Sequence, residues 1–277
     1  IYHCGEDGID FKANSYRGWS HIYDNLIYDH DEVGVSATGR GDYVKVYNNF
    51  IYNTGNTDSA AWYPYEDESF YGVKMEWNGG NNWEIYNNII YGWYKHGIGC
   101  GNRSPKIFNN TLYGNGKKSR CAEIEVDEGN PNIKNNILLH VYGSYALKIE
   151  YGTTPSSVEN NIIYSVSSDP VYLDGSGRQV PYLNDKPWAS GNLGENPELA
   201  SPGSTDPVDY KFMPGSPAEE TGLNLVERAG VSWSNDFFKI DRGAEPGELW
   251  SIGASETAYT DDPDPDPPAP PTGLKIQ

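Results

Sequence analysis

Asparagine pairs followed by an aliphatic or aromatic run recur along the first two thirds of the chain. The second position of each pair repeats at intervals of 24, 39, 22, 26 and 25 residues, and only the 39 departs from the common spacing. A repeat in this range indicates a solenoid or a propeller. The repeating positions are Asn25, Asn49, Asn88, Asn110, Asn136 and Asn161.

Each repeat contains three short runs separated by bends, which suits a closed triangular coil better than a helix pair. The third run of each repeat predicts two inward-facing columns, because side chains alternate along a strand with a period of two. An asparagine at the same bend of every coil can also hydrogen-bond to the asparagines above and below it. The expected columns are Ile9, Val35, Val73, Ile98, Ile124, Leu147 and Val171, and Phe11, Ala37, Met75, Cys100, Val126, Ile149 and Leu173.

These motifs, NNFIY, NNIIY, NNTLY, NNILL and NNIIY with their glycine-aliphatic runs, resemble the right-handed parallel β-helix proteins of the pectate-lyase-like superfamily. The resemblance covers roughly residues 1–175 and implies an all-β, right-handed parallel β-helix. It places the asparagine ladder between the second and third sheets, so the glycine-aliphatic strands form the first sheet, whose outer face usually carries the substrate groove. Lyases, hydrolases, esterases, epimerases and adhesins all use this fold, so the fold alone does not identify the function.

The chain divides into three parts. Residues 1–175 are expected to form coils, and because the chain starts within a repeat, we expect further coils before it. Residues 176–260 lack the repeat, and their PGSPA and SIGA runs resemble a terminal segment of bacterial β-helix proteins that would close the last coil as an irregular cap. Residues 261–277 form an acidic, proline-rich linker into a further module. These features predict the C-terminal part of a larger, secreted bacterial protein that is active on polysaccharide and monomeric.

The overall charge restricts the partners. A net charge of −19 without a basic patch excludes nucleic acid binding, and the chain has no apolar run of the roughly 18 residues that a membrane span needs. Three cysteines, Cys4, Cys100 and Cys121, are too few and too scattered for a disulfide framework or a zinc site.

Charged residues from three coils project from the expected outer face of the first sheet, and one coil between them has glycine at both positions. Lys74 and Glu76 lie on one strand, and Gly99 and Gly101 occupy the matching positions one coil further on. The two glycines predict a hollow flanked by charged side chains. The alternative is a solvated charge ladder with no function beyond stabilising neighbouring strands. The other charged positions on this face are Glu125, Asp127, Lys148 and Glu150.

A long insertion and several bends frame the same face. The 39-residue interval adds about 15 residues to the 24-residue repeat directly before the Lys74 strand, and long loops of this kind are often functional. Its aromatic residues could wall the hollow and stack on sugar rings, or simply pack over the coil. The expected substrate-binding residues are Trp62, Tyr63, Tyr65, His96 and Arg40.

The charges suggest β-elimination of a uronic-acid-containing glycan by a calcium-dependent polysaccharide lyase. This chemistry needs a base and a group that neutralises the substrate carboxylate. Lys148 is the preferred base and Lys74 the second candidate, with Arg103 or calcium as the electrophile. Because carboxylates surround Lys148 and favour its charged form, the mechanism requires calcium to neutralise them first. The candidate calcium ligands are Glu76, Glu125, Asp127 and Glu150.

Two other functions remain open. An inverting glycoside hydrolase could use Glu76 and Asp127 as acid and base, about 10 Å apart by strand spacing, at the edge of the range of roughly 6.5–9.5 Å for such enzymes. A carbohydrate-binding or adhesive module could hold glycan without chemistry. The net charge of −19 disfavours an anionic polymer unless calcium bridges it.

Overall fold

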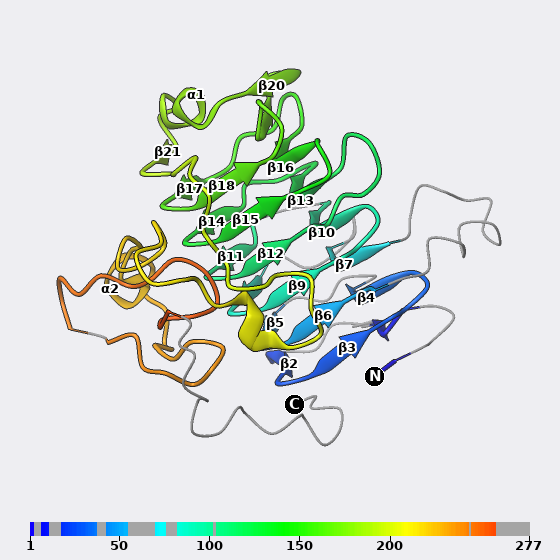
Figure 1. Cartoon of the computed structure of the whole chain (residues 1–277), viewed down its shortest axis with the longest axis vertical. Helices are drawn as coiled ribbons and strands as arrows, with labels where there is room; N and C mark the ends of the chain where they lie inside the picture. Colours follow the sequence, from blue (N-terminus) through cyan, green and yellow to red (C-terminus); the bar gives the residue numbers. More distant parts are fainter. Residues whose placement is uncertain are drawn as a thin grey trace.

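The computed structural model describes residues 1–2, 7–10, 18–37, 43–54, 70–75, 82–101, 104–243 and 245–258. Within these residues the chain winds into a right-handed parallel β-helix with three sheets (Figure 1). This confirms the predicted all-β solenoid. Both described α-helices, α1 (Val180–Asn184) and α2 (Leu225–Ala229), have five residues, far too few to cross a membrane.

Each coil contributes one strand to each sheet up to the last coil, which adds two strands to the first sheet and one to the second but, within the described residues, none to the third. The first sheet contains β1 (Ile9–Asp10), β4 (Val33–Ala37), β7 (Tyr71–Met75), β10 (His96–Cys100), β13 (Ala122–Val126), β16 (Tyr145–Ile149), β19 (Val171–Leu173) and the antiparallel β20 (Ser176–Arg178). The second contains β2 (Ser20–Tyr23), β5 (Val44–Tyr47), β8 (Trp83–Tyr86), β11 (Lys106–Phe108), β14 (Asn132–Lys134), β17 (Ser157–Glu159) and β21 (Ala189–Ser190). The third contains β3 (Leu26–Tyr28), β6 (Phe50–Tyr52), β9 (Ile89–Tyr91), β12 (Thr111–Tyr113), β15 (Ile137–His140) and β18 (Ile162–Ser165).

The predicted inward columns of the first sheet are confirmed wherever the structure describes them. Ile98 pairs with Val73 on one side and with Ile124 on the other, and all three side chains are fully buried. The same register runs from Ile9 to Val171. Phe11 lies outside the described residues.

A departure from strict alternation occurs near the start of these strands. Gly97 faces inward together with Ile98, since a Cβ atom on Gly97 would lie 2.7 Å from Leu112 Cδ2 inside the coil. Two consecutive inward residues place the preceding residue, His96, on the outer face. Its partner in the previous coil is Tyr71. The outer face therefore gains an aromatic row beside the predicted charged row.

The asparagine ladder is confirmed and runs further than the repeat predicted. Asn110 accepts hydrogen bonds from the backbone N and Nδ2 of Asn88, at 3.0 and 2.9 Å, and donates to Asn136 Oδ1 at 3.0 Å. The ladder continues to Asn192, whose Oδ1 accepts from Asn161. The left-handed backbone belongs to the first asparagine of each pair, as at Asn87 with a φ of 53°.

The end of the solenoid is closed by α1. Its Val180 and Leu183 side chains belong to the interior cluster, and β21 continues the second sheet beyond residue 175. The segment 197–258 contains the short 3₁₀ helix η2 (Pro207–Tyr210) and α2. Within the predicted capping segment 176–260, α1 closes the last coil, and residues 197–258 run back along the flank of the coils (Figure 1).

The first asparagine of four pairs holds this returning segment, namely Asn87, Asn109, Asn135 and Asn160. Asn109 Nδ2 donates to the carbonyl oxygens of Ser251 and Gly253, both at 3.1 Å, and Asn135 exchanges hydrogen bonds with the backbone of Leu223. The segment also covers apolar side chains on the outer face of the third sheet. In these four pairs the second residue joins the coils and the first fastens the flanking segment.

Candidate functional site

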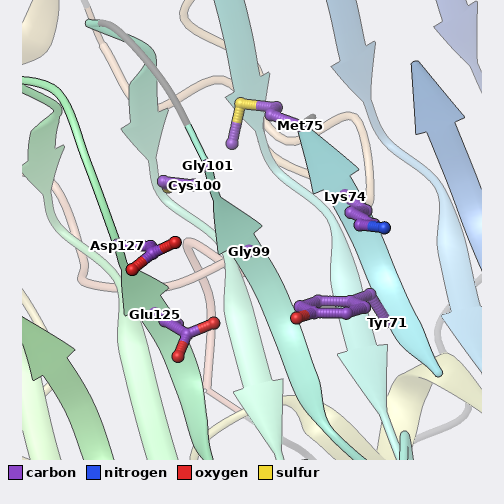
Figure 2. Close-up of a pocket in the computed structure, with 8 residues that line it drawn as sticks. All are labelled: Tyr71, Lys74, Met75, Gly99, Cys100, Gly101, Glu125 and Asp127. Carbon is purple, nitrogen blue, oxygen red and sulfur yellow. The ribbon is translucent and has the colours of Figure 1, made fainter. Parts of the chain in front are cut away.

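The outer face of the first sheet has a hollow where the two glycines were predicted to leave one (Figure 2). It spans β7, β10 and β13 and has a volume of about 280 Å³, counting the part open to solvent. Lys74 stands on the β7 side, and the carboxylates of Glu125 and Asp127 stand on the β13 side. The full lining is Tyr71, Lys74, Met75, Gly99, Cys100, Gly101, Glu125 and Asp127.

The ring of Tyr71 takes up the space directly above Gly99. A Cβ atom on Gly99 would lie 2.5 Å from Cε1 and 2.7 Å from Cδ1 of that ring. The missing side chain at Gly99 therefore makes room for the tyrosine of the preceding coil, and the open part of the hollow lies beside the ring. Tyr71 also packs near His96, with ring centroids 5.3 Å apart.

His96 opens strand β10 rather than lying in a bend, and it is buried behind the hollow. Its Nδ1 accepts a hydrogen bond from the backbone N–H of Ala122 at 2.9 Å, so the ring proton is on Nε2, which lies 3.1 Å from Glu125 Oε2. Burial, followed by the positive charges of Lys148 and Lys95, lowers the pKa of His96 well below 6.5. His96 is therefore a neutral donor that orients Glu125.

Lys148 is held between two carboxylates. Its Nζ lies 2.7 Å from Glu125 Oε1 and 2.6 Å from Glu150 Oε1. Burial would lower the pKa of Lys148, but the two carboxylates outweigh it and raise that pKa above its ordinary value. Burial also raises the pKa of Glu125, although its hydrogen bond to Lys148 opposes the shift. Lys148 thus remains an ammonium that fixes both carboxylates.

Asp127 is the carboxylate at the mouth of the hollow. Burial and the negative charge of Glu150 raise its pKa above 3.8, while Lys148 acts in the opposite direction. Lys74 lies two strands away, with β10 between them, and its register partners are Gly99 and Glu125, so the backbones of Lys74 and Asp127 are separated diagonally by about 12 Å. The hollow is therefore bipolar, with an ammonium on one wall and carboxylates on the other.

The structure brings together Lys74, His96, Glu125, Asp127, Lys148 and Glu150 from the set named by sequence. Among the described residues, no group of three His, Cys, Asp or Glu side chains is arranged to hold a metal ion, and Lys148 engages oxygens of Glu125 and Glu150. The remaining candidates lie outside the described residues: Glu76, Arg103, Arg40, Trp62, Tyr63 and Tyr65.

Comparison with known proteins gives the fold. No protein-family model and no curated protein sequence matches this chain. Among solved structures, the chain is similar to a crystal structure of pectate lyase Pel9A, with a TM-score of 0.52 and 12% sequence identity. The match covers 92% of this chain and 69% of that one. At this identity the similarity establishes the pectate-lyase-like β-helix fold alone.

Proposed function

We propose that this protein is a secreted polysaccharide lyase that cleaves a uronic-acid-containing glycan by β-elimination in the hollow beside Tyr71. The observation that carries the proposal is the bipolar arrangement of Lys74 and Asp127 across β10, on the outer face of the first sheet. Elimination needs a positive group for the substrate carboxylate and a base for the proton α to it, and these are the two groups on opposite walls.

In the proposed reaction, the ammonium of Lys74 pairs with the uronate carboxylate and stabilises the charge that develops on it. Asp127 removes the proton α to that carboxylate, a double bond forms between the α and β carbons, and the β carbon–oxygen bond breaks. Protonated Asp127 then returns its proton to the departing oxygen. The raised pKa of Asp127 makes it a stronger base than an ordinary aspartate.

Lys148, the base preferred from sequence, has a supporting role in this proposal. Its ammonium is paired with Glu125 and Glu150, and its raised pKa opposes proton abstraction at neutral pH. The function that fits its contacts is to hold both carboxylates in place. Lys74 is then the lysine that contacts the uronate carboxylate of the substrate.

Calcium is kept in the proposal as a ligand, with no chemical step assigned to it. The described carboxylates do not complete a site, because Lys148 engages Glu125 and Glu150. The predicted ligands that remain are Glu76 and Asp127, and calcium on Asp127 would have to leave one carboxylate oxygen uncoordinated for Asp127 to act as the base. Arg103 as a second electrophile, and Arg40, Trp62, Tyr63 and Tyr65 as sugar contacts, also stay proposals, whereas His96 acts by orienting Glu125.

A polysaccharide panel tests the function. We expect the protein to release products with the ultraviolet absorbance of an unsaturated uronate from at least one uronate polymer, and we expect Lys74→Ala to abolish this release. New reducing ends without unsaturation would instead indicate the inverting hydrolase. Glycan binding without any product would indicate the carbohydrate-binding module.

A further inference from the structure

Two tyrosines lie on the same face as the hollow, further along the sheet. Tyr172 continues the outward row of Gly99, Glu125 and Lys148, as the strand register shows. Three strand spacings separate it from Gly99, which corresponds to about 14 Å. A glycan laid across the strands from the hollow would therefore pass over Tyr172.

Tyr145 comes from the neighbouring strand and contacts Tyr172. Their ring centroids are 5.1 Å apart and the ring planes make an angle of 50°. Both side chains are half-buried, whereas Val171 and Leu173, on either side of Tyr172, are buried in the coil. The two rings lie outside the interior cluster, so filling the core does not explain them. A partly open pair of rings suits the apolar face of a sugar.

The charges between the hollow and this ring pair restrict what can bind there. Glu125, Asp127 and Glu150 are three carboxylates against the single ammonium of Lys148, so negative charge predominates there. Lys148 lies directly beside Tyr172 in the register. A sugar carboxylate at the ring pair would lie on the side of Glu150, and the Lys148 ammonium beside it is already paired with two carboxylates. An uncharged sugar avoids this repulsion.

We propose that Tyr145 and Tyr172 form a subsite for an uncharged sugar of the same glycan, so that the substrate is a mixed polymer of uronate and neutral units. This inference rests on the proposed function for the position of the uronate beside Lys74. It adds a specificity that the hollow alone does not provide. A polymer made only of uronate would place a carboxylate at the ring pair.

Calorimetric titration with two synthetic oligosaccharides of equal length tests the subsite. One ligand alternates uronate with neutral hexose, and the other contains the uronate alone. We expect the wild-type protein to bind the mixed ligand more tightly, and Tyr172→Ala and Tyr145→Ala to weaken that binding about fivefold to tenfold. Binding of the uronate-only ligand should change less than twofold in both variants.

Further variants separate stacking from a structural effect. Tyr172→Phe should bind like the wild type, and Tyr172→Leu should bind like Tyr172→Ala, because leucine keeps apolar volume without a flat ring. Tyr23→Ala is the matched control, since Tyr23 belongs to a stacked tyrosine pair on the second sheet, with its ring centroid 5.0 Å from that of Tyr47. It should leave both affinities unchanged.

Three results would overturn the subsite. The wild-type protein could bind the uronate-only ligand as tightly as the mixed ligand or more tightly, or it could bind neither ligand. Alternatively, Tyr172→Ala and Tyr172→Leu could bind the mixed ligand with wild-type affinity. The lyase proposal is judged separately by unsaturated product. If Tyr172→Ala keeps both wild-type turnover and wild-type affinity, the lyase stands and the subsite is lost. If the tyrosine variants lose affinity while no substrate yields unsaturated product, the subsite stands as part of a binding surface and the lyase is lost.

Discussion

The ring of Tyr71 lies on the backbone of Gly99 so closely that a single methyl group on Gly99 would come within 2.5 Å of Tyr71 Cε1. The tyrosine belongs to one coil and the glycine to the next, so this contact crosses between strands β7 and β10. It defines one wall of the hollow. Lys74 is also close to the ring, with its Nζ 5.6 Å from the centroid.

Gly99→Ala should therefore displace Tyr71. We expect the ring to move into the hollow and turnover of a uronate substrate to fall at least about tenfold. The free energy of unfolding should drop by only about 1–3 kcal/mol, the usual cost of overpacking. Gly18→Ala is the control, because a Cβ atom there meets nothing within 4 Å. Wild-type turnover in Gly99→Ala would show that the position of Tyr71 does not matter.

The asparagine ladder should carry measurable stability. Asn110→Ala removes an acceptor for two groups of Asn88 and a donor to Asn136, Ile85 and Phe108, all buried. We expect the free energy of unfolding to fall by about 3 kcal/mol, since partners of the lost amide stay buried and unsatisfied. Denaturant titration measures the change.

The control for this prediction is Asn130→Ala, at an exposed residue whose Nδ2 makes one hydrogen bond to the Thr154 carbonyl. We expect the free energy of unfolding of Asn130→Ala to fall by less than about 0.5 kcal/mol. If the two variants lose equal stability, the ladder contributes no more than a surface contact.

The flanking segment should loosen as pH rises. Burial raises the pKa of Glu256 from 4.5 to about 7, although Arg242, whose Nη1 lies 2.7 Å from Glu256 Oε2, opposes the shift. The folded state therefore binds this proton more tightly than the unfolded state does. The corresponding stability is complete below pH 4.5 and is lost as pH rises through about 7.

Comparing Glu256→Gln with the wild type isolates this effect. The amide of the variant does not titrate, so the difference in unfolding free energy, wild type minus variant, should decrease from pH 4.5 to about 7. A difference that is constant or increases for Glu256→Gln would disprove the assignment.

Calcium should raise the melting temperature if Asp127 helps to bind it, because a ligand of the folded state stabilises by mass action. Millimolar calcium should then raise the melting temperature of the wild type, and the melting temperature of Asp127→Ala should not respond to calcium. Glu159→Ala is the control, since Glu159 pairs with Lys134 on the second sheet. No shift in the wild type, or an equal shift in Asp127→Ala, would remove calcium from this site.

The repeat predicted the solenoid because it encodes contacts between equivalent positions of successive coils. Ile98, Val73 and Ile124 recur at matching places in the repeat, and the structure pairs them in that register. Asn192 was missed because glycine precedes it in place of a first asparagine and the interval from Asn161 is 31 residues. The leucine that follows it, Leu193, was the signal that could have revealed it.

The site was predicted less completely because strict alternation fails at one position. Gly97 faces inward beside Ile98, which turns His96 onto the outer face, whereas the sequence suggested a bend there. In the preceding coil, Gly72 faces inward in the same way and places Tyr71 on the outer face, over Gly99. The strength of the Lys148 ion pairs also could not be read from spacing, since it depends on which rotamers bring Nζ between two carboxylates.

The contacts of the flanking segment follow no local pattern either. Arg242 and Asn109 bind the backbone of Ser251, and both bonds join residues that the repeat leaves unrelated. Apolar residues such as Phe212 and Ile252 signal burial but do not identify the surface they cover. A sequence period predicts contacts between repeats, but it does not predict contacts between a repeat and a segment that lacks the repeat.

Steady-state formation of unsaturated product by Asp127→Asn tests the lyase most directly. The wild type and Glu159→Gln, an ion-paired carboxylate on another sheet, are the references. We predict that kcat of Asp127→Asn falls by roughly 10²–10⁴, the usual contribution of a general base, while KM stays within a few-fold and the melting temperature is unchanged. Unsaturated product at the wild-type rate from Asp127→Asn would contradict Asp127 as the base, and its absence from the wild type on every uronate polymer would contradict the lyase itself.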